Sequence, residues 1–368
     1  MTTRFGDFDF EGGYPVGDSG MRLLEQLMFN RAGEVYLTQM MAVSQIAQRE
    51  ALRDFGATTA QRVVIWEQLR DSATQLLTVN TETVYAIAHL DLTSDGPTVI
   101  DAPPQMLGVM QDGIQRYLVD IGPLGPDEGR GGLFLGLPPD YDGEVPEGFF
   151  VVRSPTYSAL LALRGFQVDG STEHAVNLIR GLQIYPLGAD PRPAMVFLNG
   201  SRQPITTVFP DTARFFDLLA MLVNEEPATI FSPLERFQMQ SIGIVKGHIF
   251  APDDATRARL DEAAQLGGAM ARANTFQPLP RYFYPGKQWQ GITDLDYTFV
   301  VDGVPQVDVR DNVYYMAIGN SYLLHIDADI PVLNFWSVLA YDAVSQFLHR
   351  SRRQRGRLHR HRLRVETA

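Results

Sequence analysis

The stretch that decides the fold reads TVNTETVYAIAHLDL at 78–92, GPTVIDAPP at 96–104, IQRYLVDIGPLG at 114–125 and PDEGRGGLFLGLPP at 126–139. Its apolar runs are short, β-branched and aromatic, and glycine and proline residues separate them. Runs of this length divided by turn residues are typical of half-buried antiparallel strands. We therefore predict a β-rich domain over residues 78–209, with later strands at 182–187 and 194–200.

A helical segment precedes this domain, over residues 1–77. Apolar side chains recur there at helical spacing from Leu23 to Ile46, which predicts one long helix or two. A second helical or mixed segment is expected over 63–77, with Trp66 buried.

Helices return over 210–275, which we predict to be a central helical connection. Its N-cap signals are Asp211, Ser232 with a proline after it, and Asp253. Their side-chain oxygens can accept hydrogen bonds from backbone N–H groups that the start of a helix leaves free. Residues 276–348 become strand-like again. The predicted fold class is therefore α+β and β-rich, with antiparallel β-sandwich or jelly-roll-like domains around the helical connection.

Composition limits the classes of protein to which this chain can belong. The 368 residues are enough for two domains with their own cores, and no cysteine is present. Disulfides and thiol catalysis are therefore excluded. The first residues lack the basic and apolar parts of a signal peptide, and no apolar run reaches the about 18 residues of a membrane span. We expect a soluble cytoplasmic protein.

The net charge of −12 combines an acidic body with a basic end. Removing the eight arginines of residues 350–364 and Glu366 leaves 23 basic and 42 acidic residues, a charge of −19. Phosphate binding needs a positive surface, so we expect no nucleic-acid partner for the body. Three interpretations of the tail at 349–368 stay open: an arm for nucleic acid or an anionic surface, a metal-binding tract, or the disordered product of a shifted frame or truncated gene. We favour the last.

Five motifs together resemble a known family. They are GGYP at 12–15, VNTETVYAIAHLDL at 79–92, GPDEGRGGLFLGLPP at 125–139, IGIVKGHIF at 242–250 and LLHIDADIPVLNFWSVLAYD at 323–342. In their order and separation they are similar to proteins that pair two domains of unknown function, numbered 1254 and 1214. The resemblance covers most of residues 8–342. It implies a β-rich N-terminal domain, a helical connection and a C-terminal β-sandwich, and it implies no established activity.

The chain departs from this family pattern in its C-terminal part. In relatives a long stretch separates the counterparts of Asn320 and Tyr322, which Ser321 alone joins here. Relatives also continue with further strands beyond the counterpart of Asp342. We therefore expect an internal deletion and a truncated, 1214-like partial β-sandwich over 276–348. Such a truncation would leave sheet edges uncovered.

The glycine-rich run GPDEGRGG at 125–132 has two interpretations. It could cradle a phosphate, but it lacks the lysine and hydroxyl residue that end a P-loop, and a predicted strand follows it. We therefore interpret it as the turn of a β-hairpin. The chain also has no nucleophile elbow and no dinucleotide-binding motif, so α/β-hydrolase and Rossmann chemistry is not expected.

His89 and Asp91 form the polar pair best suited to chemistry. They are two residues apart, and on a strand this spacing puts both side chains on one face. A histidine with a near-neutral pKa beside a carboxylate can act as a general base. Glu82 is the third candidate for this acid and base role. The alternative is a histidine at the rim of the domain whose hydrogen bonds serve only the structure.

Tyr85, Arg116 and Asp120 lie on neighbouring predicted segments, and we interpret them as candidate ligand-binding residues. They could converge with His89 at the mouth of the β-rich domain, where barrels and sandwiches hold ligands. The histidines of the body are scattered, without the spacing of a metal site, so no metal ligands are assigned. No motif identifies a cofactor.

Three functions stay open from the sequence. The first is the binding of a small polar, sugar-like or acidic ligand, without demonstrated catalysis. The second is a hydrolase- or lyase-type enzyme that uses His89 with Asp91 or Glu82 as acid and base. The third is a structural protein whose sheets form a homo-oligomer. A crevice that joins His89 to two carboxylates and Arg116 would favour the enzyme over the binding protein.

Overall fold

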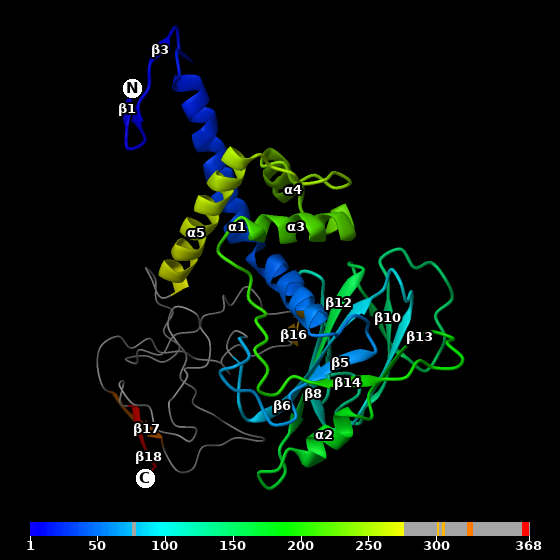
Figure 1. Cartoon of the computed structure of the whole chain (residues 1–368). Helices are drawn as coiled ribbons and strands as arrows, with labels where there is room; N and C mark the ends of the chain where they lie inside the picture. Colours follow the sequence, from blue (N-terminus) through cyan, green and yellow to red (C-terminus); the bar gives the residue numbers. More distant parts are fainter. Residues whose placement is uncertain (76–78, 276–299, 302–303, 306–321, 327–362, 368) are drawn as a thin grey trace.

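The fold is that of a computed structural model, which describes residues 1–75, 79–275, 300–301, 304–305, 322–326 and 363–367. Two layers make up its larger part, a β-sandwich and a group of helices around one long helix (Figure 1). Most neighbouring strands are antiparallel, and the fold class is α+β and β-rich, as predicted.

Two sheets form the β-sandwich. The strands of the larger sheet are β5 (Arg62–Ile65), β6 (Thr83–Asp91), β8 (Met106–Asp112), β9 (Tyr117–Ile121), β12 (Ser158–Phe166) and β14 (Val196–Asn199). They lie in the order β14-β5-β6-β12-β8-β9. The strands of the smaller sheet are β7 (Thr98–Ala102), β10 (Gly132–Leu137), β11 (Phe150–Arg153) and β13 (Gln183–Pro186). Their order is β11-β10-β7-β13.

The two sheets enclose an apolar core between them. Val84, Ala86 and Leu90 of β6 belong to this core, and Ile100 and Phe134 join it from the smaller sheet. Full burial of such leucine, isoleucine and phenylalanine side chains stabilises the fold by about 1.5–3 kcal/mol each. Because strand residues alternate between faces, the odd-numbered residues of β6 point out of the sandwich.

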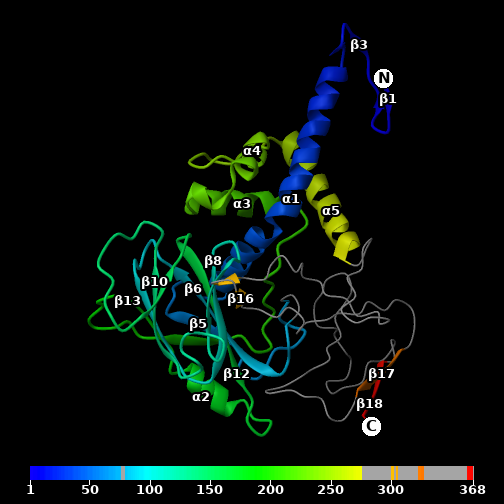
Figure 2. The same ribbon diagram turned by 180° about the vertical axis from the view of Figure 1, so that it is seen from behind.

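The helices are α1 (Ser19–Asp54), α2 (Glu173–Ile179), α3 (Arg214–Glu225), the short 3-10 helix η1 (Ala228–Ile230), α4 (Pro233–Ser241) and α5 (Asp254–Thr275). In Figures 1 and 2, α3, α4 and α5 gather around α1, and α2 lies apart from them on the sandwich. Tyr36 of α1 packs with Phe215 of α3 and Ala263 of α5 in their common core. These helices form one layer that α1 connects to the sandwich.

The last turns of α1 rest on the outer face of the larger sheet. Leu52 of α1 packs there in one apolar cluster with Trp66, Ile87 and Leu160. Trp66 is fully buried in this cluster, which confirms the prediction for this residue. The cluster therefore joins the helical layer to the sheet that carries β6.

Short strands lie outside these two layers. They are β1 (Thr2–Thr3), β2 (Gly6–Asp7), β3 (Phe10–Glu11), β4 (Tyr14–Pro15), β15 (Val300–Val301), β16 (Val304–Pro305), β17 (Tyr322–Ile326) and β18 (Leu363–Thr367). The basic tail, expected to be disordered, contributes β18, which pairs in parallel with β17. The rest of this tail, and most of the expected partial β-sandwich at 276–348 with its deletion, lie outside the described residues.

Two predicted elements are wrong. The segment expected to be helical or mixed begins instead with β5, whose Val63 and Ile65 face the sandwich core while Val64 faces the α1 cluster. A strand buried on both faces lacks the alternation that identifies strands in a sequence. The glycine-rich run at 125–132 is no hairpin turn, because it leads from β9 of the larger sheet to β10 of the smaller.

The helix caps agree with the sequence in two of three cases. Ser232 forms a capping box with Glu235 at the start of α4, and Asp253 accepts a hydrogen bond from the backbone of Thr256 at 2.7 Å. Asp211 does not cap α3. Its carboxylate instead accepts hydrogen bonds from the hydroxyl of Tyr36 and from Arg272, so it joins α1 and α5 to the segment that precedes α3.

Candidate functional site

Strand β6 carries three candidate residues on the outer face of the larger sheet. Tyr85, His89 and Asp91 share this face, since the even-numbered residues of β6 point into the sandwich core. The common face of His89 and Asp91 is the one that their spacing predicted. Helix α1 packs over it, so we call it the covered face of the larger sheet, marked on β6 by Tyr85, Ile87, His89 and Asp91.

His89 lies in a narrow crevice between α1 and the covered face. The lining residues are Gln45, Ile46, Arg49, His89, Gly113, Ser158, Ala159 and Leu222. The crevice is too thin to hold a water molecule. His89 is partly buried, and its Nε2 atom is fully buried without a hydrogen-bond partner among the described residues. Burial, and then the positive charges of Arg49 and Arg53, lower the pKa of His89 to about 3.

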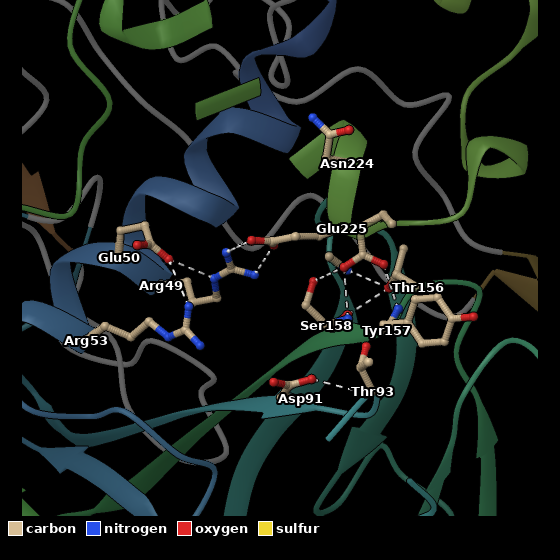
Figure 3. Close-up of polar contacts among 12 residues, drawn as sticks. Arg49, Glu50, Arg53, Asp91, Thr93, Thr156, Tyr157, Ser158, Asn224 and Glu225 are labelled. Atoms are coloured by element: carbon tan, nitrogen blue, oxygen red, sulfur yellow. Dashed lines mark hydrogen bonds and ion pairs between the residues drawn. The ribbon is translucent and has the colours of Figure 1, made fainter. Parts of the chain in front are cut away.

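This environment does not suit acid or base catalysis. With a pKa of about 3, His89 is neutral at physiological pH and a weak base. The carboxylate of Asp91 serves the turn after β6, where it accepts a hydrogen bond from the backbone of Thr93 at 3.1 Å (Figure 3). It also accepts one from the hydroxyl of Ser94 at 2.9 Å. Glu82 precedes β6, which places it about 23 Å from His89 along the strand. The hydrolase or lyase alternative therefore stays a prediction without support from this geometry.

Charged groups join the helices to the His89 end of the sheet. Arg49 of α1 forms ion pairs with Glu225 at the end of α3, at 2.7 Å, and with Glu50, at 3.1 Å (Figure 3). Glu226 is 1% exposed and accepts hydrogen bonds from the backbone N–H groups of Tyr157, at 2.6 Å, and Ser158, at 2.9 Å. These contacts hold α1 and α3 over the start of β12 and keep the crevice closed.

The opposite end of the covered face holds a buried cation that the sequence did not single out. Arg70 follows β5 and is 3% exposed. Its guanidinium carbon lies 3.9 Å from the ring centroid of Trp66 and 4.2 Å from that of Tyr85. In the described part of the chain, none of its three side-chain nitrogens has a hydrogen-bond partner. Burial lowers the pKa of Arg70 to about 9, so the group stays charged at neutral pH.

The other ligand-binding candidates lie in two further places. Arg116, in the turn between β8 and β9, donates from Nε to Asp112 Oδ2 at 2.7 Å, near the His89 end of the sheet. Asp120 of β9 accepts a hydrogen bond from the hydroxyl of Tyr117 at 3.2 Å, and burial raises its pKa. Tyr85 alone among the predicted residues contacts Arg70. The six candidates of the sequence therefore do not form one site.

Buried polar atoms without a partner gather around the covered face. Across the described residues, they are Gln45 Oε1, Gln48 Oε1, Arg70 Nε, Nη1 and Nη2, His89 Nε2 and Arg116 Nη2. Gln45 and Gln48 belong to α1, and the other three residues belong to strands or loops of the larger sheet. The core between the two sheets is apolar. Of these residues, Gln45 and His89 line the crevice, and Arg70 lies against Tyr85 at the other end of the covered face.

Two other kinds of feature were sought in the described ranges. Within them, no three histidine, aspartate or glutamate side chains come together as metal ligands would. None of the described helices combines the length and the apolar character that crossing a membrane requires.

The fold and this face define an α+β protein in which a long helix covers one outer face of a β-sandwich. Residues 61–186, which include β5 through β13, match the model of a family described as Protein of unknown function (DUF1254). The match supports the resemblance for the β-rich domain. The 1214-like partner domain and the internal deletion stay predictions.

Two solved structures are similar to parts of the chain. The VPA0106 protein from Vibrio parahaemolyticus has 16% sequence identity and a TM-score of 0.45, over 67% of this chain and 58% of that protein. An uncharacterized protein from Burkholderia cenocepacia has 14% identity and a TM-score of 0.25, over 46% of this chain and 50% of that protein. The chain thus spans less than two thirds of either protein. No curated protein matches it.

Proposed function

We propose that the protein binds a small polar molecule between α1 and the covered face of the larger sheet. The supporting observation is the set of buried, unpaired polar atoms on both sides of this interface. A buried donor or acceptor without a partner costs about 1–3 kcal/mol. A bound polar, sugar-like or acidic molecule would supply the missing hydrogen bonds.

The predicted residues have different parts in this proposal. His89 acts as a neutral hydrogen-bonding group, because its low pKa removes it from proton transfer at neutral pH. Arg116 offers its unpaired Nη2 at the same end, and Tyr85 offers a ring face at the other. A ligand at the His89 end must displace the side chains that close the crevice, such as Ile46 and Leu222. A ligand that binds at the Arg70 end would leave these side chains around His89 in place.

A thermal-shift screen of polar metabolites tests the proposal. Wild-type protein is compared with His89→Leu and Tyr85→Leu, one variant for each end of the covered face. The matched controls His174→Leu and Tyr14→Leu replace the same residue types at exposed positions. A true ligand should raise the melting temperature of the wild type and the controls, and shift at least one of the two test variants less.

Two results would contradict this function. One is an equal shift in the wild type and in both test variants, which would place the ligand elsewhere. The other is no shift from any compound together with a higher melting temperature of His89→Leu, which would make the unpaired atoms a packing defect of the interface.

A further inference from the structure

Arg70 is a buried cation without a counter-charge among the described residues. Buried arginines are usually paired with carboxylates. Arg49 of the same molecule follows this rule, because Glu50 and Glu225 both lie within ion-pair distance of it. Arg49 is 9% exposed and Arg70 only 3%, so Arg70 needs compensation at least as much. Yet no acidic side chain in the described ranges forms an ion pair or hydrogen bond with Arg70.

The two aromatic rings satisfy only part of this guanidinium. Contact with the faces of Trp66 and Tyr85 stabilises the cation by up to about 2 kcal/mol when water is excluded. The N–H bonds of a guanidinium point outward in its own plane, away from stacked rings. Removing these N–H groups from water without replacing their hydrogen bonds costs several kcal/mol. The rings therefore orient Arg70 and leave its hydrogen-bonding edge for another molecule.

The loop that carries Arg70 holds it in one place. Leu69, the residue before it, has a φ of 68°, and this left-handed conformation costs a non-glycine residue on the order of 1–3 kcal/mol. Trp66 is anchored as well, because its Nε1 donates to Thr74 Oγ1 at 3.0 Å. The Thr74 hydroxyl in turn donates to the carbonyl of Gln203 at 3.4 Å. The strained backbone at Leu69 and the anchored ring of Trp66 thus hold Arg70 in a fixed position, as a binding residue requires.

We propose that Arg70 binds the carboxylate of a small organic acid, an inference that rests on the proposed ligand-binding function of the covered face. The planar fork of a guanidinium matches a carboxylate with two parallel hydrogen bonds. One carboxylate also balances one buried positive charge, whereas a phosphate monoester carries about −1.5 to −2. Trp66 and Tyr85 present aromatic surface to the rest of the acid.

Isothermal titration calorimetry on the full chain tests this assignment. The probes are acetate, benzoate, phenyl phosphate and the neutral ester methyl benzoate. Arg70→Met removes the charge, and Arg70→Lys keeps the charge but removes the fork. Arg192→Met is the matched control, because Arg192 also stacks on a tyrosine, 4.1 Å from the centroid of Tyr185, but at an exposed position.

We expect benzoate to bind the wild type and Arg192→Met alike, and Arg70→Met about tenfold more weakly or less, with Arg70→Lys between them. Methyl benzoate should not distinguish these proteins. Without ligand, Arg70→Met should melt no lower than the wild type, since it removes an uncompensated buried charge. This melting temperature also shows whether the variant is folded.

Three results would overturn the assignment. Equal affinity of Arg70→Met and wild type for benzoate would exclude Arg70 as the binding group. If phenyl phosphate binds and benzoate does not, the group that Arg70 binds would be a phosphate rather than a carboxylate. No carboxylate binding, while a neutral ligand acts through His89, would overturn this inference and leave the proposed function standing.

Discussion

Arg49 and Glu225 form a bidentate ion pair, with Nη1 of Arg49 2.7 Å from Oε2 of Glu225 and Nη2 3.1 Å from Oε1. The pair links α1 to the last residue of α3 (Figure 3). Arg49 also lines the crevice that holds His89. The side chain of Arg49 is only 11% exposed, so water screens this charge weakly. The ion pair therefore fixes a positive charge whose field acts on the buried imidazole.

Arg49→Met should raise the pKa of His89. The neighbouring positive charges of Arg49 and Arg53 disfavour the imidazolium, and they add to burial, which is the larger cause of the low pKa. Removing one charge should therefore move the pKa only part of the way back to its ordinary value. An NMR titration of the His89 ring measures this change. Arg31→Met, at the exposed half of α1, is the control, and the idea fails if both variants titrate like the wild type.

The low pKa of His89 predicts a loss of stability in acid. In the unfolded chain the imidazole of His89 has a pKa of about 6.5, whereas in the folded protein its pKa is about 3. Between these values the unfolded state binds more protons, so the free energy of unfolding should fall as the pH drops. His89→Gln should flatten this dependence in urea denaturation from about pH 7 to about pH 4. His174→Gln, on the exposed surface, should keep the wild-type slope, and equal slopes for all three proteins would refute the prediction.

Glu226, close to the same crevice, should change stability with pH in the opposite direction. Burial raises the pKa of its carboxyl group, so the folded state holds its proton to higher pH than the unfolded state does. The stability that Glu226 contributes is present below the ordinary glutamate pKa and is lost as pH rises through the raised value. Glu226→Gln should remove this fall and lower stability by about 1–3 kcal/mol at all pH, because its amide cannot accept every N–H bond from Tyr157 and Ser158. Glu173→Gln, which is exposed, is the control in urea denaturation.

The sequence predicted strands best where one face of the strand meets the core. β6 has this pattern, and its bounds fall inside the predicted run. The neighbouring β5 lies in a segment that the sequence predicts to be helical or mixed, since Val63, Val64 and Ile65 are all buried and give no strand alternation. The glycine-rich run at 125–132 differs from its predicted hairpin turn for another reason. A run of turn residues looks the same whether it joins two strands of one sheet or crosses to another sheet, and long-range pairing decides between them.

The site was harder to predict than the fold, because its residues meet only in three dimensions. The spacing of His89 and Asp91 correctly placed both on one face. Nothing near them in the sequence indicates that Arg49, on a helix far upstream, lowers the pKa of His89. Arg70 has no local signal beyond its position shortly after Trp66. Its contact with Tyr85 depends on the pairing of β5 with β6, which brings Trp66 and Tyr85 side by side.

Gly122→Ala should be severely destabilising. Gly122 follows β9 with a φ of 119°, and a methyl group there would lie 2.0 Å from the carbonyl oxygen of Met106 on β8. Since both a backbone clash and an unfavourable φ are involved, we expect a loss of more than about 3 kcal/mol in urea denaturation. Gly96→Ala is the matched control, because Gly96 has a φ of 63° but open space around it. The control should lose only about 1–2 kcal/mol, the cost of the left-handed conformation. Similar small losses in both variants would show that β8 can move away from Gly122, and that the contact does not hold this edge of the larger sheet in place.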